Sequence, residues 1–230
     1  MKSITIRQPG YLPYIGFFKK IQSSDEFVYL DDVQYERGDW DNRNRIRTRT
    51  GITWLTVPVY NKFQQNLNQV IITNKENWSK KHIKTIEINY QNAPYFSTYW
   101  DSIKLILNKF WEKLIDLNLA LIELFNDILE IKTKTIRSSE LNIKSNGSER
   151  LLDICKQLNA TTYVSGELGK NYLNEEIFRN AGIEVKYENF QYPIYKQIHG
   201  KDFIPNLSII DLLFNEGINS KEILQSTKNL

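Results

Sequence analysis

The chain has almost none of the residues that build disulfide scaffolds or metal centres. Its 230 residues include one cysteine and two histidines. One cysteine cannot form an intrachain disulfide, and two distant histidines with one cysteine do not give the ligand spacing of a zinc site. The sequence therefore predicts a protein of a reducing compartment, which we take to be cytoplasmic, with no bound metal.

Long apolar runs and a strong excess of one charge are also absent. No segment approaches the roughly 20 apolar residues of a membrane helix, and Met1-Lys2-Ser3 leads directly into a predicted strand. Thirty basic and 27 acidic residues give a net charge of +3. This balance argues against a dedicated nucleic-acid binder. We expect neither a membrane span nor a nucleic-acid partner.

Glycine-rich phosphate-binding motifs are missing too. No Gly-x-Gly-x-x-Gly follows the first predicted strand, and no Gly-x-x-x-x-Gly-Lys-Ser/Thr occurs anywhere. Ser165-Gly166 lacks the preceding glycine of a nucleophile elbow. The sequence therefore predicts no tightly bound cofactor.

Strand and helix patterns alternate at both ends of the chain. Strands are predicted at 4–6, 27–30, 161–164 and 183–187, and helices at 14–21, 149–158 and 171–180. This alternation favours a mostly parallel sheet built from two βαβ units. We predict a Rossmann-like α/β fold in a single domain over 1–217, followed by a charged C-terminal tail, 218–230, that packs little.

Two further segments interrupt the alternating pattern. Arginine recurs at every second position from Arg43 to Arg49, so a strand there places the arginines on one face and Asn42 and Asn44 on the other. With residues 52–59 this strand predicts an inserted β-hairpin. Residues 94–130 carry an apolar stripe, which predicts one long helix or two joined near Asp116. The stripe indicates core packing or a homodimer seam.

Polar and aromatic side chains follow the first two predicted strands. In open α/β sheets, ligands bind beyond the carboxyl ends of the strands. We therefore predict a substrate-binding pocket at this edge. Its candidate residues are Gln8, Tyr11, Tyr14, Asp31, Gln34, Trp40, Asn42, Arg43 and Asn44, with Ser165, Gly166 and Tyr172 from a later strand end.

His82 and Asp32 are the candidate catalytic residues. Histidine titrates near neutrality, and the lysines at 80, 81 and 84 disfavour its protonated form, which leaves an imidazole suited to accept a proton. The alternative is a structural histidine on a helix. Arg43 could bind a diphosphate or an acidic carrier protein, and the Ser165-Gly166 turn could donate backbone N–H groups to an anion.

Several motifs in order resemble one known family. They are Gln8-Pro9-x-Tyr11-x-Pro13-Tyr14-Ile15-Gly16, Asp31-Asp32-Val33-Gln34-Tyr35, Trp40-x-Asn42-Arg43-Asn44, Trp54-Leu55-Thr56-Val57-Pro58, Tyr163-x-Ser165-Gly166 with Tyr172-Leu173, and Pro205-x-Leu207-Ser208-Ile209-Ile210-Asp211. Across about residues 4–217 these motifs look like those of the WbqC-like protein family.

The resemblance implies a role in building bacterial surface polysaccharides such as O-antigen. It suggests a transferase that moves an acyl or aminoacyl group to a nucleotide-linked amino sugar. Because the chain has no coenzyme signature of its own, we expect an acyl or aminoacyl thioester as co-substrate, with an acyl or peptidyl carrier protein as partner. The alternatives are a non-catalytic binding or scaffold protein of a glycan assembly complex, and a glycosyltransferase with a metal at Asp31-Asp32.

Overall fold

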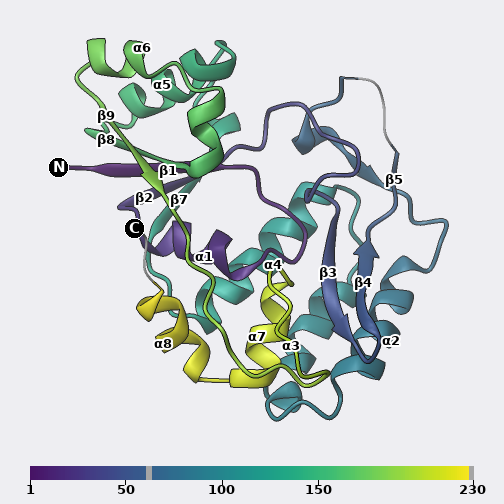
Figure 1. The fold of residues 1–230 in the computed structure, drawn as a ribbon. Coiled ribbons are helices and arrows are strands. Elements are labelled where there is room, and N and C mark those ends of the chain that lie inside the picture. Colours follow the sequence, from purple (N-terminus) through teal and green to yellow (C-terminus); the bar gives the residue numbers. More distant parts are fainter. Residues whose placement is uncertain (61–63, 228–230) are drawn as a thin grey trace.

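The computed structural model describes residues 1–60 and 64–227, and a five-stranded sheet forms one end of the molecule (Figure 1). The strands are β1 (Ser3–Arg7), β2 (Glu26–Tyr29), β7 (Lys134–Arg137), β8 (Thr162–Gly166) and β9 (Glu184–Glu188). Their order is β7-β2-β1-β8-β9, and every neighbouring pair is parallel. The predicted Rossmann-like architecture is confirmed. Chain order reverses between β1 and β8, which is where such sheets usually open a crevice.

Helices cover both faces of this sheet. They are α5 (Gly147–Gln157) and α6 (Glu175–Asn180) on one face and α1 (Ile15–Gln22) on the other (Figure 1). Ile4 and Ile6 of β1 pack in the core under α5 and α6, whereas Phe27 and Tyr29 of β2 pack in the core under α1. Successive side chains of a strand point to opposite faces, so burial on both sides explains why these strands are apolar throughout.

The second part of the molecule is mainly helical. It contains β3 (Arg43–Thr48), β4 (Gly51–Thr56), β5 (Val59–Tyr60), β6 (Ile71–Ile72), α2 (Trp78–Tyr90), α3 (Phe96–Asn108), α4 (Leu114–Ile128) and α7 (Ile209–Glu216). Short 3₁₀ helices, η1 (Leu67–Gln69), η2 (Ser138–Glu140) and η3 (Glu167–Asn171), complete the connections. Helices α1, α2, α3, α4 and α7 and the inner face of the β3–β4 hairpin share one hydrophobic core. In the described part of the chain, no helix is long and apolar enough to cross a membrane.

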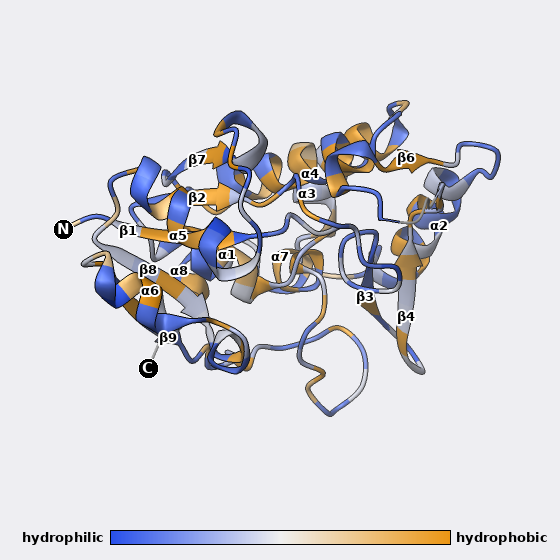
Figure 2. Ribbon diagram, turned by 90° about the horizontal axis from the view of Figure 1, so that it is seen from above, coloured by the Kyte–Doolittle hydropathy of each residue, from blue (hydrophilic) through white to orange (hydrophobic). Residues whose placement is uncertain are grey.

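The apolar stripe predicted over 94–130 lies inside this core. The chain forms two helices there, α3 and α4, and the break falls at 109–113, just before the predicted junction at Asp116. Stripe residues Trp100, Ile103, Leu107, Leu114, Leu117 and Leu121 are buried. Figure 2 shows apolar residues concentrated along α3, α4, β1 and β2. Most of the stripe is therefore used within the chain, as the core-packing interpretation predicts.

The predicted hairpin is confirmed as β3 paired antiparallel with β4. Asn44 and Ile46 are buried, and Arg43 and Arg45 lie on the opposite, outer face. Arg47 is on the same face of the strand as Arg43 and Arg45, but it is only 4% exposed. The turn at Gly200 packs directly against its guanidinium group, so this end of the strand is covered.

The segment after Gly217 does not behave as the loosely packed tail that the sequence predicts. Residues Asn219–Ser226 form helix α8, and its Leu224 is fully buried. Lys19 of α1 donates from Nζ to the carbonyl oxygens of Leu224 at 3.0 Å and Gln225 at 3.1 Å. An apolar anchor and a cation at the helix C-terminus thus attach α8 to α1.

The connection from β1 to α1 is buried although it has no regular structure. Residues 9–13 are all buried, so their backbone carbonyls need partners inside the protein. Asn118 of α4 donates from Nδ2 to the carbonyl oxygens of Pro9 at 2.9 Å and Asp41 at 2.8 Å. Asn44 donates from Nδ2 to the carbonyl oxygen of Leu12 at 2.7 Å. Two amides therefore fix this loop against the hairpin and α4.

We predict that Asn118→Leu destabilises the protein by about 2–5 kcal/mol, because it leaves two buried carbonyl oxygens unpaired. The free energy of unfolding from urea titration measures this loss. Asn126→Leu on the same helix is the matched control, since the Asn126 amide makes only one long hydrogen bond, 3.5 Å to Tyr29 Oη. Equal losses for the two variants would contradict the assigned role.

Candidate functional site

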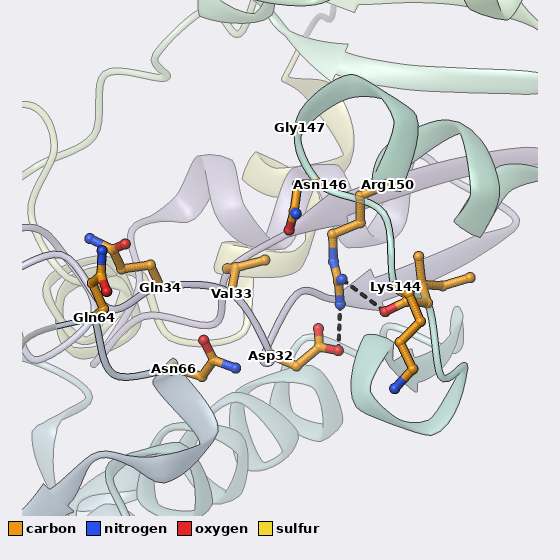
Figure 3. A pocket seen from close by; sticks show the side chains of 10 residues that line it. Asp32, Val33, Gln34, Gln64, Asn66, Lys144, Asn146, Gly147 and Arg150 are labelled. Atoms are coloured by element: carbon orange, nitrogen blue, oxygen red, sulfur yellow. Dashed lines mark hydrogen bonds and ion pairs between the residues drawn. The ribbon is translucent and has the colours of Figure 1, made fainter.

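A cavity of about 540 Å³ opens at the carboxyl ends of β2 and β7 (Figure 3). It is lined by Asp32, Val33 and Gln34 after β2, by Gln64 and Asn66 before η1, and by Ile143, Lys144, Asn146, Gly147 and Arg150 around the start of α5. Its volume suits a ligand of nucleotide-sugar size. The sequence predicts a polar pocket at this sheet edge, and the cavity brings the predicted residues Asp32 and Gln34 together there.

Asp32 and Arg150 face each other across one end of the cavity, as Figure 3 shows. The Arg150 guanidinium is buried and forms an ion pair with the Asp32 carboxylate through Nη2. Its Nη1 donates to the carbonyl oxygens of Ile143 at 3.1 Å and Ser145 at 3.2 Å. Ser138 donates from Oγ to Asp32 Oδ1. Arg150 therefore holds both Asp32 and the 143–145 backbone in place.

Asp31 does not line this cavity and instead holds two strands of the sheet together. It is fully buried, and it accepts hydrogen bonds from Arg137 Nε at 2.7 Å and from the Ser139 backbone N–H at 2.9 Å. Ser138 also donates to it. These contacts join the carboxyl ends of β2 and β7. The Asp31 carboxylate therefore has structural hydrogen-bond partners, and a substrate contact by Asp31 stays a prediction.

Gln8 lies next to the cavity, whereas Tyr14 belongs to another cluster. Gln8 Nε2 donates to the carbonyl oxygen of Gln34 at 3.3 Å, so it contacts a lining residue. Tyr14 packs against Phe190 and Tyr192, with ring centroids 6.1 and 6.4 Å away. Of these two predicted residues, the structure brings Gln8 to the cavity.

His82, Tyr11 and the two predicted asparagines form a buried structural network. Tyr11 Oη is hydrogen-bonded to His82 Nδ1 at 2.9 Å, and His82 is also hydrogen-bonded to the Thr56 backbone. Asn42 Nδ2 donates to the carbonyl oxygen of Val57 at 2.8 Å, and Asn44 binds the 11–12 backbone. His82 does not line the cavity that Asp32 lines. Its role as a base stays a prediction, and the geometry favours the structural alternative.

Burial sets the protonation of His82. The side chain is 6% exposed, and loss of water around the ring lowers its pKa to about 4, although the hydrogen bond to Thr56 acts in the opposite direction. The imidazole is therefore neutral at pH 7. The lysines near it in sequence are not the main cause of this neutrality.

Trp40 and Arg43 lie on the outer face of the hairpin. Trp40 is 39% exposed, and the Arg43 guanidinium stacks over Trp54 with its Cζ 4.4 Å from the ring centroid. Neither residue lines the cavity. Together these residues form an exposed surface of guanidinium groups and tryptophan rings.

Ser165, Gly166 and Tyr172 lie beyond the carboxyl end of β8. Ser165 is buried, whereas Tyr172 is 68% exposed. Lys20 of α1 reaches the same strand end, since a Cβ built on Gly166 would lie 3.0 Å from Lys20 Nζ. Lys20 lies 3.7 Å from Glu188, and its burial lowers the pKa of the ammonium group. This second polar cluster occupies the point where strand order reverses, separate from the cavity lining.

Asp41, between the predicted residues Trp40 and Asn42, is a further candidate that the sequence pattern alone does not indicate. It is 5% exposed, and no group in residues 1–60 or 64–227 donates to its Oδ2. Burial, and then the charge of Asp39, raise its pKa to about 7, while Arg7 at the end of β1 lowers it. A buried carboxyl that titrates near neutrality is a typical acid or base.

Metal-ligating side chains do not gather at this sheet edge. Over the described ranges, no group of three or more His, Cys, Asp and Glu side chains could hold a metal ion. Asp31 and Asp32 are instead held by arginine and serine side chains. The single cysteine, Cys155, is buried in α5, and burial raises its pKa to about 12.

We predict that Asp41 makes the protein less stable as the pH rises from 5 to 8. The folded-state pKa of about 7 exceeds the usual aspartate value, so the stabilising contribution is complete below pH 4 and is lost as the pH rises through 7. At about 1.4 kcal/mol per pKa unit, the unmodified protein should lose about 2–3 kcal/mol of unfolding free energy between pH 5 and pH 8, and Asp41→Asn should abolish this loss. Urea titrations at both pH values measure it. Asp101→Asn, an exposed carboxylate, should leave the pH dependence unchanged.

We also predict that His82 stays neutral to about pH 5. Its folded-state pKa is below the usual histidine value, so its contribution to stability is present above pH 6.5 and is lost as the pH falls through 4. Proton NMR of the imidazole Cε1–H, assigned with His82→Asn, measures the titration. A midpoint near 6.5 would contradict the buried network.

The comparisons with known proteins agree with the sequence motifs. The chain is 37% identical over 229 residues to the uncharacterized protein Rv1507c of Mycobacterium tuberculosis, and the match covers 98% of each chain. No solved structure matches the chain. The WbqC-like protein family matches residues 8–223, which include the cavity, the buried asparagine network and the hairpin. The chain belongs to the WbqC-like protein family.

Proposed function

We propose that the protein is a transferase of bacterial surface polysaccharide biosynthesis. It moves an acyl or aminoacyl group from a thioester donor to the amine of a nucleotide-linked amino sugar. The observation that carries this proposal is the cavity at the carboxyl ends of β2 and β7, which combines amide side chains, a lysine and a helix start in one space. Membership of the WbqC-like family supports the pathway assignment.

The diphosphate of the substrate would bind at the α5 end of the cavity. Lys144 is exposed there, Asn146 is the N-cap of the 11-residue helix α5, and the first backbone N–H groups of such a helix have no partner within it. A cation and a helix N-terminus both favour an anion. Arg150 acts as a positioning residue, because it already binds Asp32 and the backbone of the preceding loop.

The sugar would bind toward the opposite wall of the cavity. Gln34, Gln64 and Asn66 supply both donors and acceptors there, as sugar hydroxyl groups require. Asp32 can accept one more hydroxyl hydrogen bond, since its side chain is 18% exposed beside Arg150. Such a mixed amide and carboxylate lining suits a neutral sugar ring more than an apolar ligand.

In the transfer, the base removes a proton from the ammonium group, the amine forms an amide bond to the thioester carbonyl carbon, and the C–S bond breaks to release the donor as a free thiol. The step therefore needs a base and donors for the oxyanion. Neither Asp41 nor His82 lines the cavity. Asp41 fits the base better, because its Oδ2 has no hydrogen-bond partner in the described chain, whereas His82 Nδ1 is hydrogen-bonded to Tyr11 Oη. Asp41 belongs to the segment that continues from the cavity wall through Gln34. The amides of Asn42 and Asn44 bind backbone, so the candidate oxyanion donor is the Ser165-Gly166 turn at the end of β8, outside the cavity lining.

The test is incubation with amino-sugar nucleotides and with acyl and aminoacyl thioesters, read by mass spectrometry. We expect one nucleotide-sugar to gain the mass of the acyl group. Lys144→Ala should raise KM for the nucleotide-sugar about tenfold, which corresponds to about 1.4 kcal/mol for one charged contact, with kcat nearly unchanged. Lys156→Ala, a lysine on α5 outside the cavity lining, is the matched control.

Asp41→Asn should lower kcat by about 100-fold or more while KM changes little, because it removes proton transfer and not binding. No mass shift across a broad panel of donors and sugars would overturn the proposed function. Normal turnover of Asp41→Asn would overturn the choice of base alone.

A further inference from the structure

The outer face of the hairpin carries exposed indoles and guanidinium groups that the proposed reaction does not use. We call it the Arg–Trp face and define it by Trp40, Arg43, Arg45, Ile52 and Trp54. Both tryptophans and Ile52 are about two-fifths exposed, at 39%, 41% and 41%. Trp and Arg are the residues most enriched at the energetic centres of protein interfaces. The face has the composition of a binding surface.

Stacking fixes the geometry of the two arginines. The Arg43 Cζ lies 4.4 Å from the Trp54 ring centroid, and the Arg45 Cζ lies 5.3 Å from that of Trp40 and 5.7 Å from that of Trp54. Arg45 Nη2 also donates to the carbonyl oxygen of Asn206 at 3.1 Å, and Arg43 Nη2 donates to that of Gly38. The guanidinium planes are therefore held before any partner arrives, which lowers the entropy cost of binding.

The hairpin that carries this face is basic. Residues 43–56 contain four arginines and no aspartate or glutamate, and the exposed acidic residues Glu36 and Asp39 lie in the segment before Trp40. That excess is larger than the net charge of +3 of the whole chain, so the rest of the chain is net acidic. The complementary partner is an acidic surface.

The stacking also favours carboxylates over sugars or bases as the partner groups. A sugar or nucleobase binds to an open indole face, but the guanidinium groups already lie over the indoles. The Nε–H group of each arginine is buried, so each guanidinium offers its terminal Nη N–H groups outward, and a carboxylate can accept hydrogen bonds from them. An Asp- or Glu-bearing protein surface satisfies both the charge and this geometry.

We propose that the Arg–Trp face is the docking surface for an acidic carrier protein that delivers the thioester donor. The identity of this partner rests on the proposed transferase function. Trp40 ends the segment that starts at the cavity wall with Asp32 and Gln34, and the Tyr11 backbone N–H donates to the Trp40 carbonyl oxygen at 3.1 Å. A carrier protein bound to this face therefore contacts the same segment that lines the substrate cavity.

The test is calorimetric titration of the full chain with each purified acyl and peptidyl carrier protein encoded in the source genome, in apo and holo forms. We expect one carrier protein to bind, and binding to weaken as salt screens the charges. The double variant Arg43→Glu, Arg45→Glu should weaken the Kd at least tenfold. The matched control is the double reversal Lys156→Glu, Arg179→Glu on α5 and α6, which should leave the Kd within twofold.

A second variant tests whether weaker binding by the arginine variant results from misfolding. Ile52→Glu adds an acidic group to the Arg–Trp face without touching the stacked pairs, so it should weaken binding while thermal melting stays unchanged. The proposal is overturned if no carrier protein binds. It is also overturned if the variants do not discriminate, or if an anionic polysaccharide or single-stranded DNA competes at the same face with equal affinity.

These experiments test the docking proposal and the transferase proposal separately. Acyl transfer from a free thioester without any carrier-protein binding would overturn the docking proposal and leave the transferase intact. Carrier-protein binding without a mass shift on any sugar would do the reverse.

Discussion

Buried backbone that belongs to no helix or strand is the constraint on which the rest of this structure depends. Residues 9–13 must run through the interior to connect the central strand to α1, and their carbonyl groups cannot reach water. Asn118 and Asn44 supply the missing donors, and Leu12 accepts a left-handed φ of 45° to fit. Because the same two amides also hold Asp41 and the hairpin, one set of hydrogen bonds aligns the sheet edge with the helical part.

Polar residues in this protein divide between two tasks. Asn42, Asn44 and Asn118 satisfy backbone groups, and Asp31 joins two strand ends. The cavity uses a different set, of which Gln34, Asn66 and Lys144 are examples. A polar residue in a strongly apolar neighbourhood costs free energy unless its hydrogen-bond partners are in place. Substitution of the residues that bind backbone groups is therefore as restricted as substitution of catalytic residues.

The sequence was sufficient for the sheet, the hairpin and the edge at which a cavity opens, because these follow from the period of the apolar residues. It correctly placed Asn42 and Asn44 on an inner face. It could not distinguish an amide that lines a cavity from one that binds a backbone carbonyl, since both look alike in a strand pattern. Arg150 and Lys144 were missed because only the parallel arrangement of β2 and β7 brings α5 next to Asp32. The burial of Arg47 depends on the turn at Gly200, which no local pattern predicts.

The place of β1 in the sheet has a consequence for how the chain folds during synthesis. Its partner β2 follows within thirty residues, but its other neighbour, β8, begins at Thr162. One edge of the central strand must therefore wait, unpaired, while most of the chain leaves the ribosome. Pairing over so long a separation slows folding and leaves an apolar edge open to aggregation.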